Sequence, residues 1–370
     1  MNKLTHGQVF QLMEEWAPKY LAYDWDPIGL QVGNHHDVVK NILVTLDVTI
    51  EVVQEAIEKD VNLIVAHHPM LFRAVQSINT QTPQGKLLKL LLKHNITVYA
   101  AHTNLDIAKG GVNDVLANLL QLKDTKPLAD IQHESLYKIV VFVPESHAEE
   151  VRNALNLGGA GHIGNYSHCT FQSKGEGTFK PLEGTNPFIG TQGKIEYVAE
   201  YKIESIVPQN KLQKSIEKMI ASHPYEEVAY DVYPLQNEGK TFGLGRIGKW
   251  PEKQTLENVI HDVKEAFQLN HLRVTGDLKK KINRVAIIGG SGEKYIQTAK
   301  HSGADLLITG DVTFHQAQIA QQIGLAIIDA GHYIENLAIE TVQQYLQNKL
   351  THENIDIHRS TINTNPFQYV

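Results

Sequence analysis

Short apolar segments alternate with helical patterns at both ends of this chain, and that alternation limits the possible folds more than any other feature. In the first third, strands are predicted over residues 41–46, 62–66 and 97–101. Helices are predicted over residues 49–59, 85–94 and 111–120. Apolar strands separated by helices of about ten residues are typical of a mostly parallel sheet with both faces covered. We therefore predict an α/β fold.

The last third of the chain repeats the pattern. Strands are predicted over residues 284–288, 305–309 and 325–329, and helices over 313–322 and 333–346. A glycine-rich run, 289–292, follows the first of these strands. We interpret it as a tight turn, with contact to a phosphate group as the alternative, because it is neither a P-loop nor a full dinucleotide fingerprint.

The middle of the chain has a different character. Predicted strands cover 136–143, 196–203 and 228–233, and predicted helices cover 147–155 and 211–221. This order indicates an antiparallel α+β unit of ferredoxin-like type. We place this unit at residues 129–239, inserted into a two-lobed core that residues 1–128 and 240–370 form together.

Composition excludes several classes of protein. The 370 residues are 42% hydrophobic and carry a net charge of −7, so nucleic acid is not an expected partner. Cys169 is the single cysteine, which excludes an intrachain disulfide and a multi-thiolate zinc site. Glu14 and Glu15 stand where a signal peptide needs an apolar core, and no apolar run reaches the roughly 18 residues of a membrane span. We expect a cytoplasmic protein without membrane contact.

Histidines and carboxylates follow three of the predicted strands. The residues concerned are His67, His68, His102, Asp106, His332 and Glu335. Open α/β sheets place ligand sites at the carboxyl ends of their strands. Taken singly, each patch also has an ordinary explanation: a core histidine beside a surface one, a turn with a capping aspartate, or an acidic first helical turn.

Taken together, the three patches predict a metal site. The expected ligands are His67, His68, Asp106, His332 and Glu335. Imidazole with carboxylate suits zinc first, and also Fe, Mn, Co or Ni, but disfavours Ca and Mg. Five ligands exceed the three that usually hold one catalytic zinc ion. Two divalent ions per chain, bridged by Asp106 or Glu335, use all five.

Two further histidines are candidates for moving protons at this site. His315 follows the strand at 305–309, and His102 follows the strand at 97–101. A position near the mouth of the site suits general acid–base catalysis. The alternative for His315 is a histidine on a helix surface.

Five motifs in the flanking regions resemble the Nif-three-like family (NGG-interacting factor three). They are WDPIGLQVG at 25–33, AHHP at 66–69, AHTNLD at 101–106, TGD at 309–311 and GHYIEN at 331–336. The resemblance implies a toroidal homohexamer with a two-metal site on its inner surface. It implies the same five ligands, and bacterial members are labelled GTP cyclohydrolase I type 2 homologues.

The middle region has a likeness of its own. HPYEEV at 223–228, leading to DVYPL at 231–235, is similar to a strand motif of CutA and PII-like trimers. The likeness implies trimer contacts, capping of the ring openings, or sensing of a small ligand. A structural turn with an edge strand is the alternative.

The favoured function is a dinuclear metal-dependent hydrolase with a small-molecule substrate, a nucleotide among the candidates. If the cyclohydrolase label applies, activated water attacks the guanine ring of GTP and formate leaves. The alternative is a non-enzymatic, ring-shaped metal-binding scaffold or regulator whose PII-like insert senses a small ligand. An open coordination position favours the enzyme, and a sealed site favours the scaffold.

Overall fold

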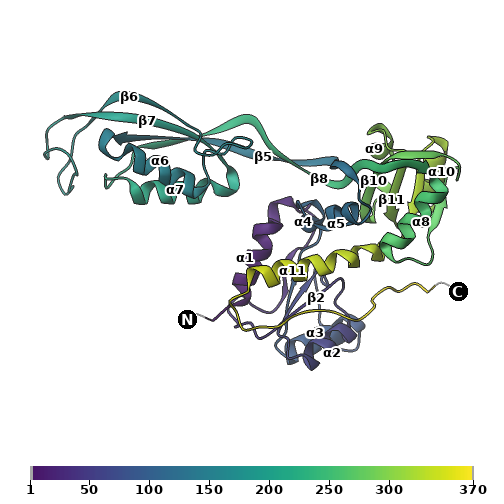
Figure 1. Ribbon diagram of the computed structural model, residues 1–370. Helices are drawn as coiled ribbons and strands as arrows, with labels where there is room; N and C mark the ends of the chain where they lie inside the picture. Colours follow the sequence, from purple (N-terminus) through teal and green to yellow (C-terminus); the bar gives the residue numbers. More distant parts are fainter. Residues whose placement is uncertain (1–2, 369–370) are drawn as a thin grey trace. The chain divides into compact units, whose positions relative to one another are not determined.

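The computed structural model describes residues 3–368 (Figure 1). Its contacts divide the chain into two compact units. The first, here called the core unit, comprises Met1–Ile131 and Phe242–Val370, and the second, the inserted unit, is Gln132–Thr241. The sequence predicts boundaries between domains after residues 128 and 239. That these domains fold separately stays a prediction.

A five-stranded sheet forms one part of the core unit. Its order is β1 (Gly29–Val32), β4 (Thr97–Ala100), β3 (Leu63–Ala66), β2 (Ile42–Thr45) and β13 (Ile357–Arg359). Every neighbouring pair is parallel except β1 with β4. The prediction of a mostly parallel sheet is therefore confirmed here.

Helices cover both faces of this sheet, since alternate strand residues point to opposite sides. Leu43 packs with α2 (Ile50–Glu58) and α3 (Pro83–Lys93). Val44 packs on the other face with α1 (His6–Trp16) and α11 (Ile339–Lys349). Figure 1 shows α2 and α3 on one side of β2 and α11 on the other.

A second sheet completes the core unit. Its order there is β8 (Tyr230–Thr255), β10 (Lys281–Ser291), β11 (Leu306–Gly310), β12 (Ala326–Asp329) and β9 (Arg273–Thr275). In this part of the sheet, β10, β11 and β12 are parallel to one another. The flanking strands are antiparallel to their neighbours, β8 to β10 and β9 to β12. The expectation of a mostly parallel sheet is wrong here, since apolar periodicity does not encode the direction of a flanking strand. Both sheets are mixed, and the fold is mixed α/β.

The remaining helices of the core unit connect these strands. They are η1 (Lys19–Leu21), α4 (Thr103–Ile107), α5 (Val112–Leu119), α8 (Leu256–Phe267), η3 (Glu293–Tyr295), α9 (Ile296–His301), α10 (Phe314–Gln322) and η4 (His332–Ala338). The helix predicted over 333–346 begins as the 3₁₀ segment η4 and becomes α-helical only at Ile339. The predicted tight turn at 289–292 is wrong, because β10 continues to Ser291.

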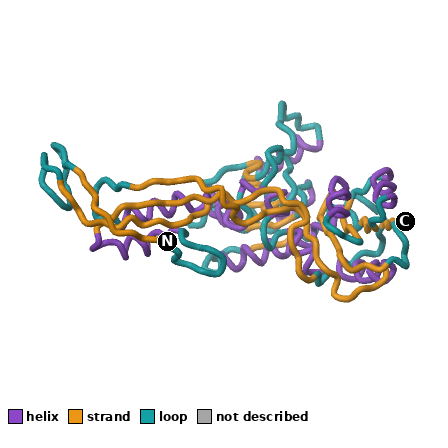
Figure 2. The backbone as a smooth tube through the Cα atoms, turned by 90° about the horizontal axis from the view of Figure 1, so that it is seen from above, coloured by secondary structure: helices purple, strands orange, loops and turns teal. Residues whose placement is uncertain are grey.

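The inserted unit consists of long strands and two helices. Its elements are β5 (Lys123–Pro144), η2 (Glu145–His147), α6 (Ala148–Gly158), β6 (Thr170–Phe179), β7 (Glu196–Pro208), α7 (Gln209–Ser222) and the first part of β8. The strand order is β6-β7-β5-β8, with β7 antiparallel to both neighbours. Figure 2 shows these strands running alongside one another. Val141 and Ile203 of the sheet pack against α6 and α7 through Val151 and Met219.

Within residues 3–368, none of the helices combines the length and the apolar character that crossing a bilayer requires.

Candidate metal centre

Six imidazole and carboxylate side chains converge in the core unit. They are His67, His68, His102, Asp106, His332 and Glu335. Their donor atoms form three overlapping groups, and within each group all atoms lie within 4.8 Å of one another. The structure thus brings together all five predicted ligands, and His102 joins them.

The ends of the strands place these side chains. His67 and His68 follow β3, and their amides donate to Thr45 O and Leu46 O at 3.0 and 2.9 Å. The β2–β3 ladder therefore continues past the strand and holds the histidine pair. Asp106 lies in the short helix α4, directly after β4.

Glu335 stands at the centre of the cluster. Its Oε2 atom lies 3.0 Å from His68 Nε2, 3.2 Å from His332 Nε2 and 3.8 Å from His67 Nε2. His332 and Glu335 are three residues apart in η4, where side chains at that spacing eclipse. Ligands about 2.0–2.2 Å from one metal ion are themselves about 3.0–3.5 Å apart, so these separations fit shared coordination.

The Nδ1 atom of each histidine ring has a fixed partner outside the cluster, so Nε2 is the atom that faces the cluster and could bind a metal. The Nδ1 contacts are His67 to Ala101 O (2.8 Å), His68 to Asp47 (2.7 Å), His102 to Asp26 (2.9 Å) and His332 to Asp311 (2.6 Å). Such partners set the tautomer and the orientation of metal-binding histidines.

These carboxylate partners were not predicted from the sequence. Asp47 and Asp311 each come directly after a strand region, so the strand-end rule that found the ligands could also have found them. Asp26 does not follow a strand, because β1 begins only at Gly29, and its signal in the sequence is its place in the family motif at 25–33.

Two buried atoms in the cluster have no hydrogen-bond partner among the described residues: His67 Nε2 and Asp106 Oδ1. They lie 3.6 Å apart. His67 donates its one proton through Nδ1 to Ala101 O, so its Nε2 presents a lone pair to a carboxylate oxygen. Two buried acceptors that face each other are stabilised by a cation between them, either a metal ion or a proton on Asp106. The donor set therefore fits a divalent transition metal.

Protonation of the cluster leads to the same conclusion. Burial lowers the pKa of His67 to about 3, which leaves that ring neutral and able to ligate. Burial and the nearby Glu335 raise the pKa of Asp106. Burial also opposes charge on His68, but its hydrogen bonds with Asp47 and Glu335 raise its pKa to about 10. The hydrogen bond with Glu335 likewise raises the pKa of His332 to about 9. Without a metal, His68 and His332 therefore carry protons beside the ionised Glu335, and Asp106 is pushed towards its neutral form.

Gly290 leaves the space that Glu335 occupies. A Cβ at this position would lie 2.5 Å from Glu335 Oε1 and 3.2 Å from His332 Nε2. Its φ of +61° also lies in the left-handed region that favours glycine. The glycine-rich run therefore serves close approach to the carboxylate.

His315 is not brought into the cluster. It is exposed on α10, and its contacts are with Gln318 and with the Phe314 ring, both on its own helix. Its role in proton transfer stays a prediction. His102, the other candidate, shares a donor group with His67 and His68.

One side of the cluster is open. The side chain of His332 is 38% exposed, whereas that of Glu335 is 4% exposed. Trp25, itself 58% exposed, stacks on Tyr23 and lies 6.4 Å from the ring of His102 between centroids. The cluster is therefore reachable from solvent at His332, and an aromatic surface lies beside His102.

Comparison with known proteins places the chain in a family. The model of Duf34/NIF3 (NGG1p interacting factor 3) matches residues 4–366. Relatives named "GTP cyclohydrolase 1 type 2 homolog" from Halalkalibacterium halodurans and Bacillus subtilis are 50% and 46% identical, with 100% of each chain covered. The crystal structure of a Bacillus cereus protein related to NIF3 matches with a TM-score of 0.94 and 47% identity, again over 100% of both chains. The chain therefore belongs to the Duf34/NIF3 family, as the sequence motifs indicated.

Proposed function

We propose that this protein is a metal-dependent hydrolase that holds two divalent transition-metal ions, with zinc as the first candidate. The observation that carries the proposal is the buried, unpartnered pair of His67 Nε2 and Asp106 Oδ1 inside the donor cluster. Two such acceptors would destabilise a purely structural core, since each buried polar atom without a partner lowers the stability of the fold by about 1–3 kcal/mol.

The donor groups suggest how two ions would share the ligands. His67, Asp106 and Glu335 form one group, and His68, His332 and Glu335 form another. Glu335 belongs to both, so it is the better candidate for the bridge than Asp106. His102, in a third group with His67 and His68, would add a sixth ligand or move a proton.

Two bound metals would lower the pKa of water and polarise a substrate. The chain's own contribution is orientation. Asp47, Asp26 and Asp311 hold three of the rings through Nδ1, so the Nε2 atoms keep their positions as charge changes. His332 lies on the exposed side, where a substrate would enter.

GTP is the first substrate to test, because relatives at 46–50% identity bear the name GTP cyclohydrolase 1 type 2 homolog. The exposed ring of Trp25, near His102, offers a surface on which a planar base could stack. Hydrolysis of the guanine ring would release formate.

The experiment measures metal per chain on protein purified without chelator, and then formate release from GTP and turnover of a phosphoester panel by the same sample. About two ions with formate release supports the full proposal. About two ions with no turnover of any substrate contradicts hydrolysis and favours the scaffold or regulator. The variant His67→Ala should lose metal, and His315→Ala is the control that should retain it.

We further propose that the inserted unit is a ferredoxin-like, PII/CutA-like domain and that the protein is a homohexamer with trimer contacts through this domain. The β-α-β-β-α-β order and the strand order β6-β7-β5-β8 support the first part. Sedimentation equilibrium tests the second, with an expected mass of six chains of 41.4 kDa each. A monomer at micromolar concentration would contradict it.

A further inference from the structure

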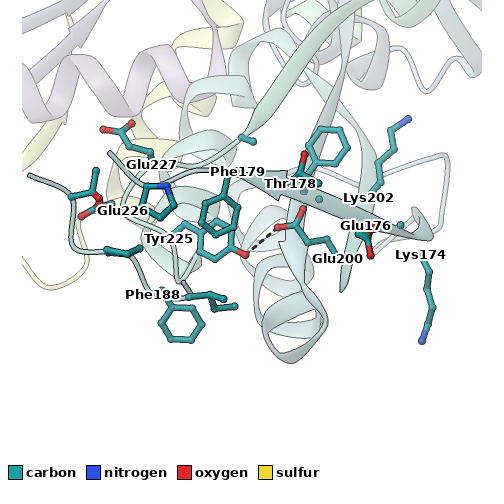
Figure 3. A pocket seen from close by; sticks show the side chains of 18 of the residues that line it. Lys174, Glu176, Thr178, Phe179, Phe188, Glu200, Lys202, Tyr225, Glu226 and Glu227 are labelled. Carbon is teal, nitrogen blue, oxygen red and sulfur yellow. Dashed lines mark hydrogen bonds between the residues drawn. The ribbon is translucent and has the colours of Figure 1, made fainter. Parts of the chain in front are cut away.

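A pocket of about 600 Å³ lies within the inserted unit (Figure 3). Strands β6 and β7, the loop that joins them and the segment before β8 form its walls. This volume is within the range of small-molecule sites, which is roughly 300–1,000 Å³. The pocket is separate from the metal centre, whose ligands all belong to the core unit.

Aromatic rings make up much of the lining. The Tyr225 ring lies 5.6 Å from Phe179 and 6.4 Å from Phe188 between centroids. Phe142 of β5 also lines the pocket. Phe188, on the loop, is 53% exposed, so part of this apolar wall faces solvent. Such a lining favours a ligand with an apolar body.

A buried carboxylate lies among these rings. Glu200 of β7 is 8% exposed, and its Oε1 atom accepts a hydrogen bond from the Tyr225 hydroxyl at 3.1 Å (Figure 3). No donor among the described residues reaches Oε2. Gly177 on β6 leaves the room for this oxygen, because a Cβ there would lie 2.2 Å from it. One acceptor of a nearly buried carboxylate is thus free for a ligand.

The charges around the pocket are mainly negative. The acidic lining residues are Glu176, Glu200, Glu226 and Glu227. Two lysines also line it, but Lys174 pairs with Glu145 at 2.8 Å and Lys202 pairs with Glu204 at 2.7 Å. Neither of these partners belongs to the lining, and Figure 3 shows both lysine side chains extending away from the labelled rings. Among the described residues that line the pocket, both lysines are thus already paired with carboxylates outside it.

We propose that this pocket binds an organic cation, a protonated amine with an apolar or aromatic body. Its ammonium group would donate to Glu200 Oε2, and its body would pack between Phe179, Phe188 and Tyr225. A cation beside the face of aromatic rings adds a further favourable interaction. A neutral alcohol of the same shape could still donate one hydrogen bond to this oxygen, but it would bring no positive charge to the carboxylate.

Three small probes of matched shape test this on the full chain: 2-phenylethylamine, 2-phenylethanol and phenylacetate. Binding is measured by titration calorimetry, with ligand-observed NMR to detect weak complexes. The amine should bind best, the alcohol about tenfold more weakly and the acid not detectably, because only the amine pairs a positive charge with Glu200 and the acid brings a second negative charge.

Variants separate the site from general electrostatics. Glu200→Gln keeps the shape and should weaken amine binding about tenfold or more. Phe188→Ala, on an exposed loop, should weaken both the amine and the alcohol. Glu183→Gln is the matched control, because it removes the same charge from an exposed glutamate outside the lining and should change nothing.

Three results would overturn the proposal. The first is equal binding of amine and alcohol, and the second is equal loss in the Glu200 and Glu183 variants. The third is no binding of the amine up to about 10 mM, which corresponds to less than about 3 kcal/mol of binding free energy. In that case a lower assembled mass for Phe188→Ala would identify the surface as a contact between copies of this chain. None of these results depends on hydrolase activity.

Discussion

Gly290→Ala tests the metal centre without removing any ligand. The new Cβ would lie 2.5 Å from Glu335 Oε1 and 3.2 Å from His332 Nε2. Glu335 is 3% exposed, so its carboxylate has little room to move away. The left-handed φ of +61° adds a backbone cost of roughly 1–2 kcal/mol for alanine.

Gly324→Ala is the matched control for the backbone cost. Its φ is +69°, but the nearest atom to its Cβ would be Lys300 Nζ at 3.7 Å. The backbone cost should therefore be roughly 1–2 kcal/mol in the free energy of unfolding for both variants, and Gly290→Ala should lose more than the control because its Cβ also meets Glu335. Only Gly290→Ala should also displace Glu335, and we expect its metal affinity to fall at least 10–100-fold, the range seen when partners of ligands are changed.

The assay is metal content by mass spectrometry after dialysis into metal buffers, beside urea unfolding of the metal-free proteins. The expected result is about two ions per chain in the control and about one or fewer in Gly290→Ala at the same free metal concentration. Equal content and equal affinity in the two variants would refute Glu335 as the shared ligand.

Three further predictions concern the same unit. Asp47→Asn should weaken metal binding about 10–100-fold in metal-buffer titrations, because Asp47 orients His68. Asp124→Asn, which removes the charge from an exposed ion pair, is the control and should leave the affinity unchanged. Equal affinities in the two variants would contradict the orientation of His68 by Asp47. Metal uptake should release at least about two protons at pH 7, because the pKa values of about 10 for His68 and about 9 for His332 keep both rings protonated until a metal binds, and the raised pKa of Asp106 favours a further proton there. Apparent affinity should therefore rise about 100-fold per pH unit between pH 7 and about 9, and calorimetry in buffers of different ionisation enthalpy that finds no release would exclude this. Deleting residues 132–241 should leave a folded core that binds the same number of ions, and an unfolded or metal-free product would contradict the insertion model.

Several parts of the structure could be predicted from local sequence patterns. Fully buried strands such as Leu63–Ala66 are short apolar runs, and the helix that begins after Thr49 carries a capping side chain. The strand-end positions of His67, Asp106 and His332 follow from the same patterns, since the carboxyl edge of a sheet is where polar side chains can gather. These features depend on residues a few positions apart.

Other features could not be predicted in this way. The antiparallel pairing of β9 with β12, the length of β5 and the 3₁₀ start at His332 depend on neighbours distant in the chain. His315 follows a strand just as the ligands do, yet its side chain lies exposed on α10. A position just after a strand therefore indicates a candidate site residue, but it does not predict the direction in which the side chain points.

The sequence by itself determined the alternation of strands and helices, the family motifs and the set of side chains able to bind metal. The tertiary structure decided which of them meet. His68 and Glu335 are 267 residues apart in the chain and 3.0 Å apart in space, and Asp26 reaches His102 across 76 residues. Periodicity reports which face of a strand or helix is buried, but it carries no information about distances between segments. Those distances, set by the packing of the core unit, leave His67 Nε2 and Asp106 Oδ1 facing each other without a hydrogen-bond partner among the described residues.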